Sequence, residues 1–214
     1  MIGALANLPV VTALDYASVL VFALTGALVA SRKQLDLVGF VFVAALTAVG
    51  GGTLRDLMLG RDPVFWVGAP GFVVLAAGAA VVVFFTAHFL ESRYRALLWL
   101  DACALAVAVP AGVGVTLALG HGPVIVVIMG IATGSFGGLM RDVVCNEVPL
   151  VLKQGELYLT CAFCGAAAAL VMVALGWAGA PALLACGGVT FALRAGSLIF
   201  GWRLPVYKAR PPRT

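Results

Sequence analysis

Seven apolar stretches dominate the sequence, and each is long enough to cross a membrane as a helix. They cover residues 10–31, 37–59, 64–90, 98–119, 123–144, 154–177 and 181–201, with short polar turns between them. About 20 apolar residues match the roughly 30 Å hydrocarbon core of a bilayer. Only 10% of the residues are charged and 63% are hydrophobic, so a soluble fold of this size could not bury the apolar surface. The stretches lack the alternation of β-barrel strands, and the sequence therefore predicts an all-α integral membrane protein with seven transmembrane helices.

Basic residues at the ends of these stretches predict how the chain is oriented. One side of the membrane collects Arg32, Lys33, Arg93, Arg95, Lys153, Arg203, Lys208, Arg210 and Arg213. The other side has Arg61 and, slightly deeper, Arg55. The positive-inside rule predicts a cell-membrane protein with its N-terminus outside and its C-terminus in the cytoplasm. The net charge of +4 then indicates contact with anionic lipid and not with nucleic acid.

The sequence repeats itself at an offset of 86 residues without a gap. Polar, glycine and proline positions coincide: Asp15 with Asp101, Gly26 with Gly112, Thr47 with Thr133, Arg55-Asp56 with Arg141-Asp142, and Pro63 with Pro149. Each unit contains three spans, and an odd number of spans turns the second unit upside down in the membrane. We therefore expect a first three-helix repeat at 1–96, an inverted repeat at 97–179, a seventh helix at 180–202 and a basic cytoplasmic tail at 203–214.

The motif Gly-Gly-x-x-Arg-Asp occurs once in each unit, at residues 51–56 and 137–142. Glycine pairs weaken a helix and permit kinks or unwinding, which a membrane tolerates only beside protein or a water-filled path. Close packing of helices through small residues is the alternative. Symmetric glycine pairs followed by Arg-Asp favour a path. Its predicted lining comprises Gly50, Gly51, Gly52, Gly134, Gly137 and Gly138.

Charged residues inside these spans need partners, because an unpaired charge in lipid costs several kcal/mol. Arg55 and Asp56 are neighbours on a helix and point about 100° apart, so we expect each to pair elsewhere. Asp15 and Arg55 both lie roughly 26 Å from the turn that joins their spans. The sequence therefore predicts an Asp15–Arg55 ion pair near the outer face. Independent extension of each side chain to the nearest interface is the alternative.

By the repeat, Asp101 and Arg141 should form the corresponding pair near the inner face. Asp56 and Asp142 then remain as freer carboxylates near opposite mouths of a path, where they would attract cations.

Three hydroxyl side chains lie close to the glycines and are candidate ligands for a monovalent cation: Thr47, Thr133 and Ser135. A bond from each hydroxyl back to its own helix is the alternative. Farther along the motif helices, Gly60 and Asn146 match as left-handed helix ends. Pro63 and Pro149 then match as starts of the next helix.

The sequence indicates no enzyme. It has no Ser-His-Asp grouping, phosphate-binding loop or metal-ligand cluster, and we expect no cofactor and no bound metal. The five cysteines, Cys161-x-x-Cys164 included, are interpreted as apolar membrane residues. Permeant K⁺ or Na⁺ and bound phospholipid are the expected ligands.

These features resemble the prokaryotic branch of the TRIC family, the trimeric intracellular cation channels. The resemblance covers about residues 10–200 and rests on the three-plus-three-plus-one spans and both glycine motifs. It implies a homotrimer with a K⁺-permeable pore inside each subunit. It also implies that spans two and five, kinked at Gly51, Gly52, Gly137 and Gly138, line the pore with spans one and four. The Lys-Glu-Val tripeptide of animal members, linked to lipid binding and gating, is absent, so the resemblance does not imply phosphoinositide control.

Two other functions fit parts of the pattern. Inverted repeats with broken helices also occur in secondary transporters, so a transporter of a small polar solute such as an amino acid is the main alternative. A structural membrane subunit is the other, although paired charges inside the membrane would have no purpose there.

Overall fold

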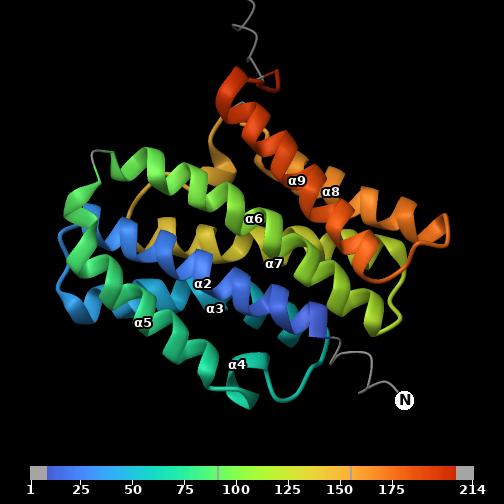
Figure 1. The fold of residues 1–214 in the computed structure, drawn as a ribbon, viewed down its shortest axis with the longest axis horizontal. Coiled ribbons are helices and arrows are strands. Elements are labelled where there is room, and N and C mark those ends of the chain that lie inside the picture. Colours follow the sequence, from blue (N-terminus) through green and yellow to red (C-terminus); the bar gives the residue numbers. More distant parts are fainter. Residues whose placement is uncertain (1–8, 91, 155, 206–214) are drawn as a thin grey trace, which may run out of the picture.

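The computed structural model describes residues 9–90, 92–154 and 156–205, and these ranges are helical apart from turns and one backbone bridge between Glu156 and Arg203 (Figure 1). The long helices are α2 (Pro9–Arg32), α3 (Leu37–Met58), α5 (Gly71–Thr86), α6 (Arg93–Ala118), α7 (Pro123–Val144), α8 (Tyr158–Ala174) and α9 (Ala180–Phe200). The short elements are α4 (Phe65–Gly68) and two 3₁₀ turns, η1 (Ala87–Phe89) and η2 (Leu150–Leu152). The prediction of an all-α membrane protein with seven apolar helices is confirmed.

Six stretches in the described ranges satisfy the length and hydropathy of a membrane span, with α5 and η1 counted together. The remaining helix, α8, has 17 residues and lies at the short end of the usual range.

The bounds of three spans differ from the prediction. The third span is divided into α4 and α5, because Pro70 disfavours a helical conformation at Ala69, whose φ and ψ are −140° and 83°. The fourth helix begins at Arg93, five residues earlier than predicted, because the Ser92 side chain accepts a hydrogen bond from the Arg95 amide and caps the helix. The sixth begins at Tyr158, four residues later than predicted.

The helices form two halves that meet along α2, α3, α6 and α7. In Figure 1, α2 (blue) and α6 (green) lie in the middle of the molecule, with α5 at one edge and α8 and α9 at the opposite side. Helix α2 packs against α3, α5 and α6, whereas α6 packs against α2, α7 and α9. One hydrophobic core lies mainly among α2, α3 and α5, and a second lies mainly among α6, α7, α8 and α9. Each repeat therefore buries its own core.

The two motif helices end in the same way. Gly60 and Asn146 have φ values of 65° and 50°, which confirms the predicted left-handed ends. Pro63 then precedes α4, and Pro149 directly precedes η2, so both prolines lead into a short helical turn and not into the long span itself.

Basic side chains from distant parts of the chain meet at one end of the molecule. The Arg32 guanidinium and the Lys153 ammonium lie 5.1 and 4.9 Å from the centroid of the Tyr94 ring. Arg32 and Lys33 also pair with Glu147, at 3.0 and 3.6 Å. The ends of α2 and α7, the start of α6 and the segment before α8 therefore share one side, as the sequence predicts. That this side is cytoplasmic stays a prediction, and Lys208, Arg210 and Arg213 lie outside the described residues.

Candidate functional site

The glycines of the two motifs lie where α3 crosses α7. A Cβ atom on Gly51 would overlap the carbonyl oxygen of Thr133, and one on Gly137 would overlap the carbonyl oxygen of Thr47. Each contact is the other shifted by 86 residues, so the pseudo-two-fold axis of the repeats passes through this crossing. Only glycine allows the two backbones to approach so closely.

Both motif helices are continuous through their glycines, α3 over Leu37–Met58 and α7 over Pro123–Val144. The unwinding that glycine pairs permit does not occur in these helices, and Gly51 and Gly137 serve close helix packing. That the helices are kinked and line a pore stays a prediction.

The other predicted glycines face side chains. A Cβ atom added to Gly50 would lie 3.0 Å from the Met140 sulfur, and one added to Gly52 would lie 2.5 Å from the Phe65 ring. A Cβ atom added to Gly134 would lie 2.6 Å from a Val109 methyl. Gly138 differs, because its nearest neighbour is the Asp101 carboxylate at 3.5 Å.

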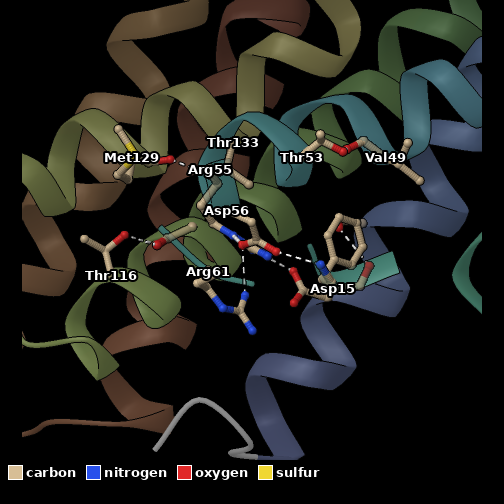
Figure 2. Close-up of polar contacts among 12 residues, drawn as sticks. Asp15, Val49, Thr53, Arg55, Asp56, Arg61, Thr116, Met129 and Thr133 are labelled. Atoms are coloured by element: carbon tan, nitrogen blue, oxygen red, sulfur yellow. Dashed lines mark hydrogen bonds and ion pairs between the residues drawn. The ribbon is translucent and has the colours of Figure 1, made fainter. Parts of the chain in front are cut away.

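The first charged cluster joins α2, α3 and the segment before α4 (Figure 2). Arg55 Nη1 donates to Asp15 Oδ1 at 2.8 Å, which confirms the predicted ion pair. Arg55 Nε donates to Asp56 Oδ1, also at 2.8 Å. Arg61 Nη1 donates to the same oxygen at 2.9 Å, and the Phe65 amide donates to Asp56 Oδ2 at 2.9 Å. Asp15, Arg55 and Asp56 are all buried, so these bonds replace solvent for every charge.

The second cluster repeats this arrangement on α6 and α7. Arg141 Nη1 donates to Asp101 Oδ1 at 3.2 Å, which confirms the second predicted pair, and Arg141 Nε donates to Asp142 Oδ1 at 2.7 Å. Asp142 Oδ2 accepts from the Leu150 amide at 2.9 Å. All three side chains are buried. The position that matches Arg61 is Glu147, which instead pairs with Arg32 across the halves.

The prediction that Asp56 and Asp142 are freer carboxylates is wrong, whereas their place near the mouths of a path stays a prediction. Each carboxylate forms an ion pair with the arginine that directly precedes it in the sequence. The Cβ atoms of the two neighbours point apart, but the long arginine side chain bends back to the carboxylate. Each carboxylate also accepts a backbone N–H from the segment that follows its helix. These bonds fix the turn after each motif. The Arg-Asp pairs therefore stabilise the fold, whether or not they also belong to a functional site.

The three hydroxyls bond to their own helices. Thr47 donates to the carbonyl of Val43, Thr133 to that of Met129, and Ser135 to that of Ile131. Thr47 and Thr133 also face Gly26 and Gly112, where a Cβ atom would lie 2.7 and 2.6 Å from the hydroxyl oxygens. The structure therefore favours a packing role for them, and ligation of a cation by these oxygens stays a prediction.

A small cavity lies beside the crossing. Its volume is about 10 Å³, which is room for about one water molecule. Its lining combines both halves: Asp15, Ser18, Phe22, Ala48, Gly51, Gly52, Phe65, Ala108 and Thr133. The cavity therefore lies between the repeats, beside the Asp15–Arg55 pair.

The sequence reasoning missed one buried charge. Arg194 on α9 is buried, and its Nη2 donates to Glu156 Oε2 at 2.8 Å. Arg194 is the one charged residue in the seventh apolar stretch, 181–201. A single charge within a membrane span needs a partner, and this could have marked Arg194 as a candidate site residue from the sequence. No group of three or more His, Cys, Asp or Glu side chains in the described part of the chain is arranged to hold a metal ion.

Comparisons with known proteins agree with this architecture. A family model described as "Glycine transporter" matches residues 12–88 and again residues 98–174, and the two matches begin 86 residues apart. A UPF0126 membrane protein of Vibrio cholerae is 34% identical over 200 residues, which cover 91% of this chain and 81% of that protein. The UPF0126 inner membrane protein YadS of Escherichia coli K12 is 38% identical over 156 residues, 71% of this chain and 73% of that protein.

Among solved structures, the TRIC trimeric intracellular cation channel orthologue of Rhodobacter sphaeroides is 47% identical. The match covers 91% of this chain and all of that one, with a TM-score of 0.87.

The fold and its charged clusters define a multi-pass membrane protein of inverted three-helix repeats. The chain belongs to the TRIC family, to which the "Glycine transporter" model corresponds. The relative YadS is named an inner membrane protein, which supports a location in the cell membrane for this multi-pass chain.

Proposed function

We propose that the protein is a potassium-permeable channel for monovalent cations, with the path inside each subunit. The path passes the crossing of α3 and α7 and is bordered by α2 and α6. The observation that carries this proposal is the cavity between the repeats, which is lined by Asp15 of the first buried Asp-Arg-Asp cluster. A corresponding buried cluster lies in the second half. The likeness to the Rhodobacter cation channel supports it.

The charges favour a cation over an anion. With all groups ionised, the first cluster is balanced, since Asp15 and Asp56 face Arg55 and Arg61. In the second cluster, Asp101 and Asp142 share Arg141 alone, which leaves one negative charge. A buried negative charge attracts permeant cations strongly because little water screens it.

The cavity is too small for a hydrated ion. Conduction therefore requires the cation to lose water or the helices around the cavity to separate. K⁺ is the preferred ion in this proposal, because a larger monovalent cation loses its water at lower cost than Na⁺.

The same proposal covers the assembly. We infer a homotrimer from the Rhodobacter relative, which is described as trimeric, with phospholipid around it and no nucleic-acid partner. The N-terminus lies outside the cell and the C-terminus inside. Repeat bounds of 1–96 and 97–179 remain part of this proposal.

A secondary transporter of a small amino acid is the second candidate. The description of the matching family model as "Glycine transporter" favours it, and inverted repeats are common in transporters.

A flux assay distinguishes the two candidates. Liposomes loaded with KCl and carrying the protein should take up tracer K⁺ at a rate that rises linearly with its concentration, whereas liposomes without protein should not. Glycine uptake should stay at the level of the empty liposomes. Saturable glycine uptake without K⁺ flux would replace the channel by the transporter.

A further inference from the structure

The seventh helix places a positive charge beside the second charged cluster. Arg194 of α9 is buried, pairs with Glu156 and lies over the Tyr158 ring, with 5.0 Å between the guanidinium carbon and the ring centroid. Because α9 is not part of the repeat, the first half has no counterpart of this residue. Any role of Arg194 therefore makes the two halves functionally different.

Tyr158 lies between Arg194 and the second cluster. A Cβ atom added to Gly138 would lie 3.7 Å from the Tyr158 hydroxyl, 3.6 Å from Arg141 Nη2 and 3.5 Å from Asp101 Oδ1. These are ordinary van der Waals distances, so a space the size of a methyl group lies in front of Gly138, surrounded by polar atoms. The hydroxyl of Tyr158 forms one of its walls.

The matching place in the first half is closed by an apolar side chain. Gly52 corresponds to Gly138, and the Phe65 ring lies 2.5 Å from where its Cβ atom would be. The Phe65 ring also packs edge-on against Phe72, at 4.9 Å between centroids. The space in front of Gly52 is thus filled by aromatic packing, whereas the space in front of Gly138 is bordered by a polar side chain that water could replace.

The closed second half leaves buried polar atoms without partners. Five buried side-chain atoms in the described ranges make no hydrogen bond, and four belong here: Asp101 Oδ2, Arg141 Nη2, Arg194 Nε and Arg194 Nη1. A buried polar atom without a partner destabilises its state. Entry of water would offer these atoms hydrogen-bond partners, which would offset part of the cost of opening the second half.

Apolar packing holds the start of α8, where Tyr158, Cys161 and Ala162 are buried, and its polar contacts are few. No side chain caps this helix, whose cap position is Leu157. The preceding residue, Glu156, is fixed by the Arg194 pair and by a backbone bridge to Arg203. The Glu156–Arg194 ion pair therefore connects α9 to the segment directly before α8.

We propose that Tyr158 is the gate of the second half and that the Arg194–Glu156 ion pair keeps this gate closed. When the pair separates, the first turn of α8 moves, Tyr158 leaves Gly138, and water and a monovalent cation enter beside Asp101 and Arg141. Arg194 and Glu156 act through Tyr158 and are positioning residues. This inference rests on the proposed function as a channel.

Single-channel recording of the full-length protein tests the inference. Glu156→Gln, which keeps the shape of a side chain that is 28% exposed, should raise the ratio of open to closed time roughly fivefold, because one charge-assisted hydrogen bond is weakened. The current through one open channel should not change. Arg194→Gln should have the same effect, the double variant should add little, and Arg194→Lys should restore part of the closure. Arg95→Gln, which removes an exposed positive charge from the same end of the molecule, is the matched control.

Hydrogen–deuterium exchange supplies a readout that does not depend on current. Peptides covering Tyr158–Ala162 should exchange faster in Glu156→Gln than in the wild type or in Arg95→Gln. Unchanged exchange and unchanged open time would overturn the inference, and faster exchange without a change in open time would overturn Tyr158 as the gate. A wild-type protein that passes no current contradicts the channel itself, and the exchange experiment still decides whether the ion pair holds α8.

Discussion

Replacing Arg141 by alanine is expected to lower the free energy of unfolding by about 3–5 kcal/mol, because two buried carboxylates lose the charge that both of them face. Without Arg141, Asp101 Oδ1 loses its hydrogen-bond donor, and Asp101 Oδ2 has none in the wild type. Asp142 keeps only the hydrogen bond from the Leu150 amide. Equilibrium unfolding in mixed micelles of constant composition measures the change.

Two arginines on the same chain serve as controls for Arg141→Ala. Arg61→Ala should cost less, because Asp56 keeps both Arg55 Nε and the Phe65 amide. Arg203→Ala should stay within about 0.5 kcal/mol of the wild type, since Arg203 is exposed. If Arg141→Ala costs no more than Arg203→Ala, the buried cluster does not hold the second half together.

Alanine at Gly51 or Gly137 is expected to lower the free energy of unfolding by about 3 kcal/mol and to change conduction as well. The new Cβ atom would overlap a backbone carbonyl oxygen on the facing helix, that of Thr133 or that of Thr47, and neither oxygen can rotate away. The crossing of α3 and α7 must therefore widen. Because the two contacts are related by the repeat, the two variants should have similar effects.

Gly78→Ala is the matched control for these variants. Gly78 lies inside α5, and nothing lies within 4 Å of its Cβ position, so alanine should leave stability unchanged or raise it by up to about 1 kcal/mol. Equal effects of Gly51→Ala and Gly78→Ala would show that the close approach of α3 and α7 is not needed.

The sequence was sufficient for the spans, the inverted repeat and the two Asp–Arg pairs. Apolar length reports the membrane directly, and a charge in lipid restricts its possible partners to a few residues at the same depth. Because the sequence repeats, a contact predicted in one half is also predicted in the other. The predicted Asp15–Arg55 ion pair therefore implied the Asp101–Arg141 ion pair. Asp15 and Arg55 could be paired because they lie at equal distances from one short turn.

Contacts that depend on side-chain length or on loops could not be predicted in this way. The Arg55–Asp56 bond forms because a flexible arginine side chain curls back, which the directions of Cβ atoms do not show. The amides of Phe65 and Leu150 reach the carboxylates only after the chain has turned at Pro63 and Pro149. Arg194 has no repeat mate, so the internal comparison carried no information about its partner.

The glycine motif shows why one pattern can support two opposite interpretations. Symmetric glycine pairs suit an unwound path and a close crossing equally well, since both need a missing side chain. Only the position of the facing backbone decides between them, and Gly51 and Gly137 lie against carbonyl oxygens of α7 and α3.

The reversal potential of single-channel currents tests the account most directly. The purified protein is inserted into a planar bilayer with a tenfold KCl gradient, and the current is recorded as a function of voltage. Stepwise currents that reverse near the potassium equilibrium potential, about 59 mV from zero for one charge, are the predicted result. Reversal near the chloride potential, or a silent bilayer from a preparation that takes up glycine in liposomes, would contradict a cation path between the two repeats.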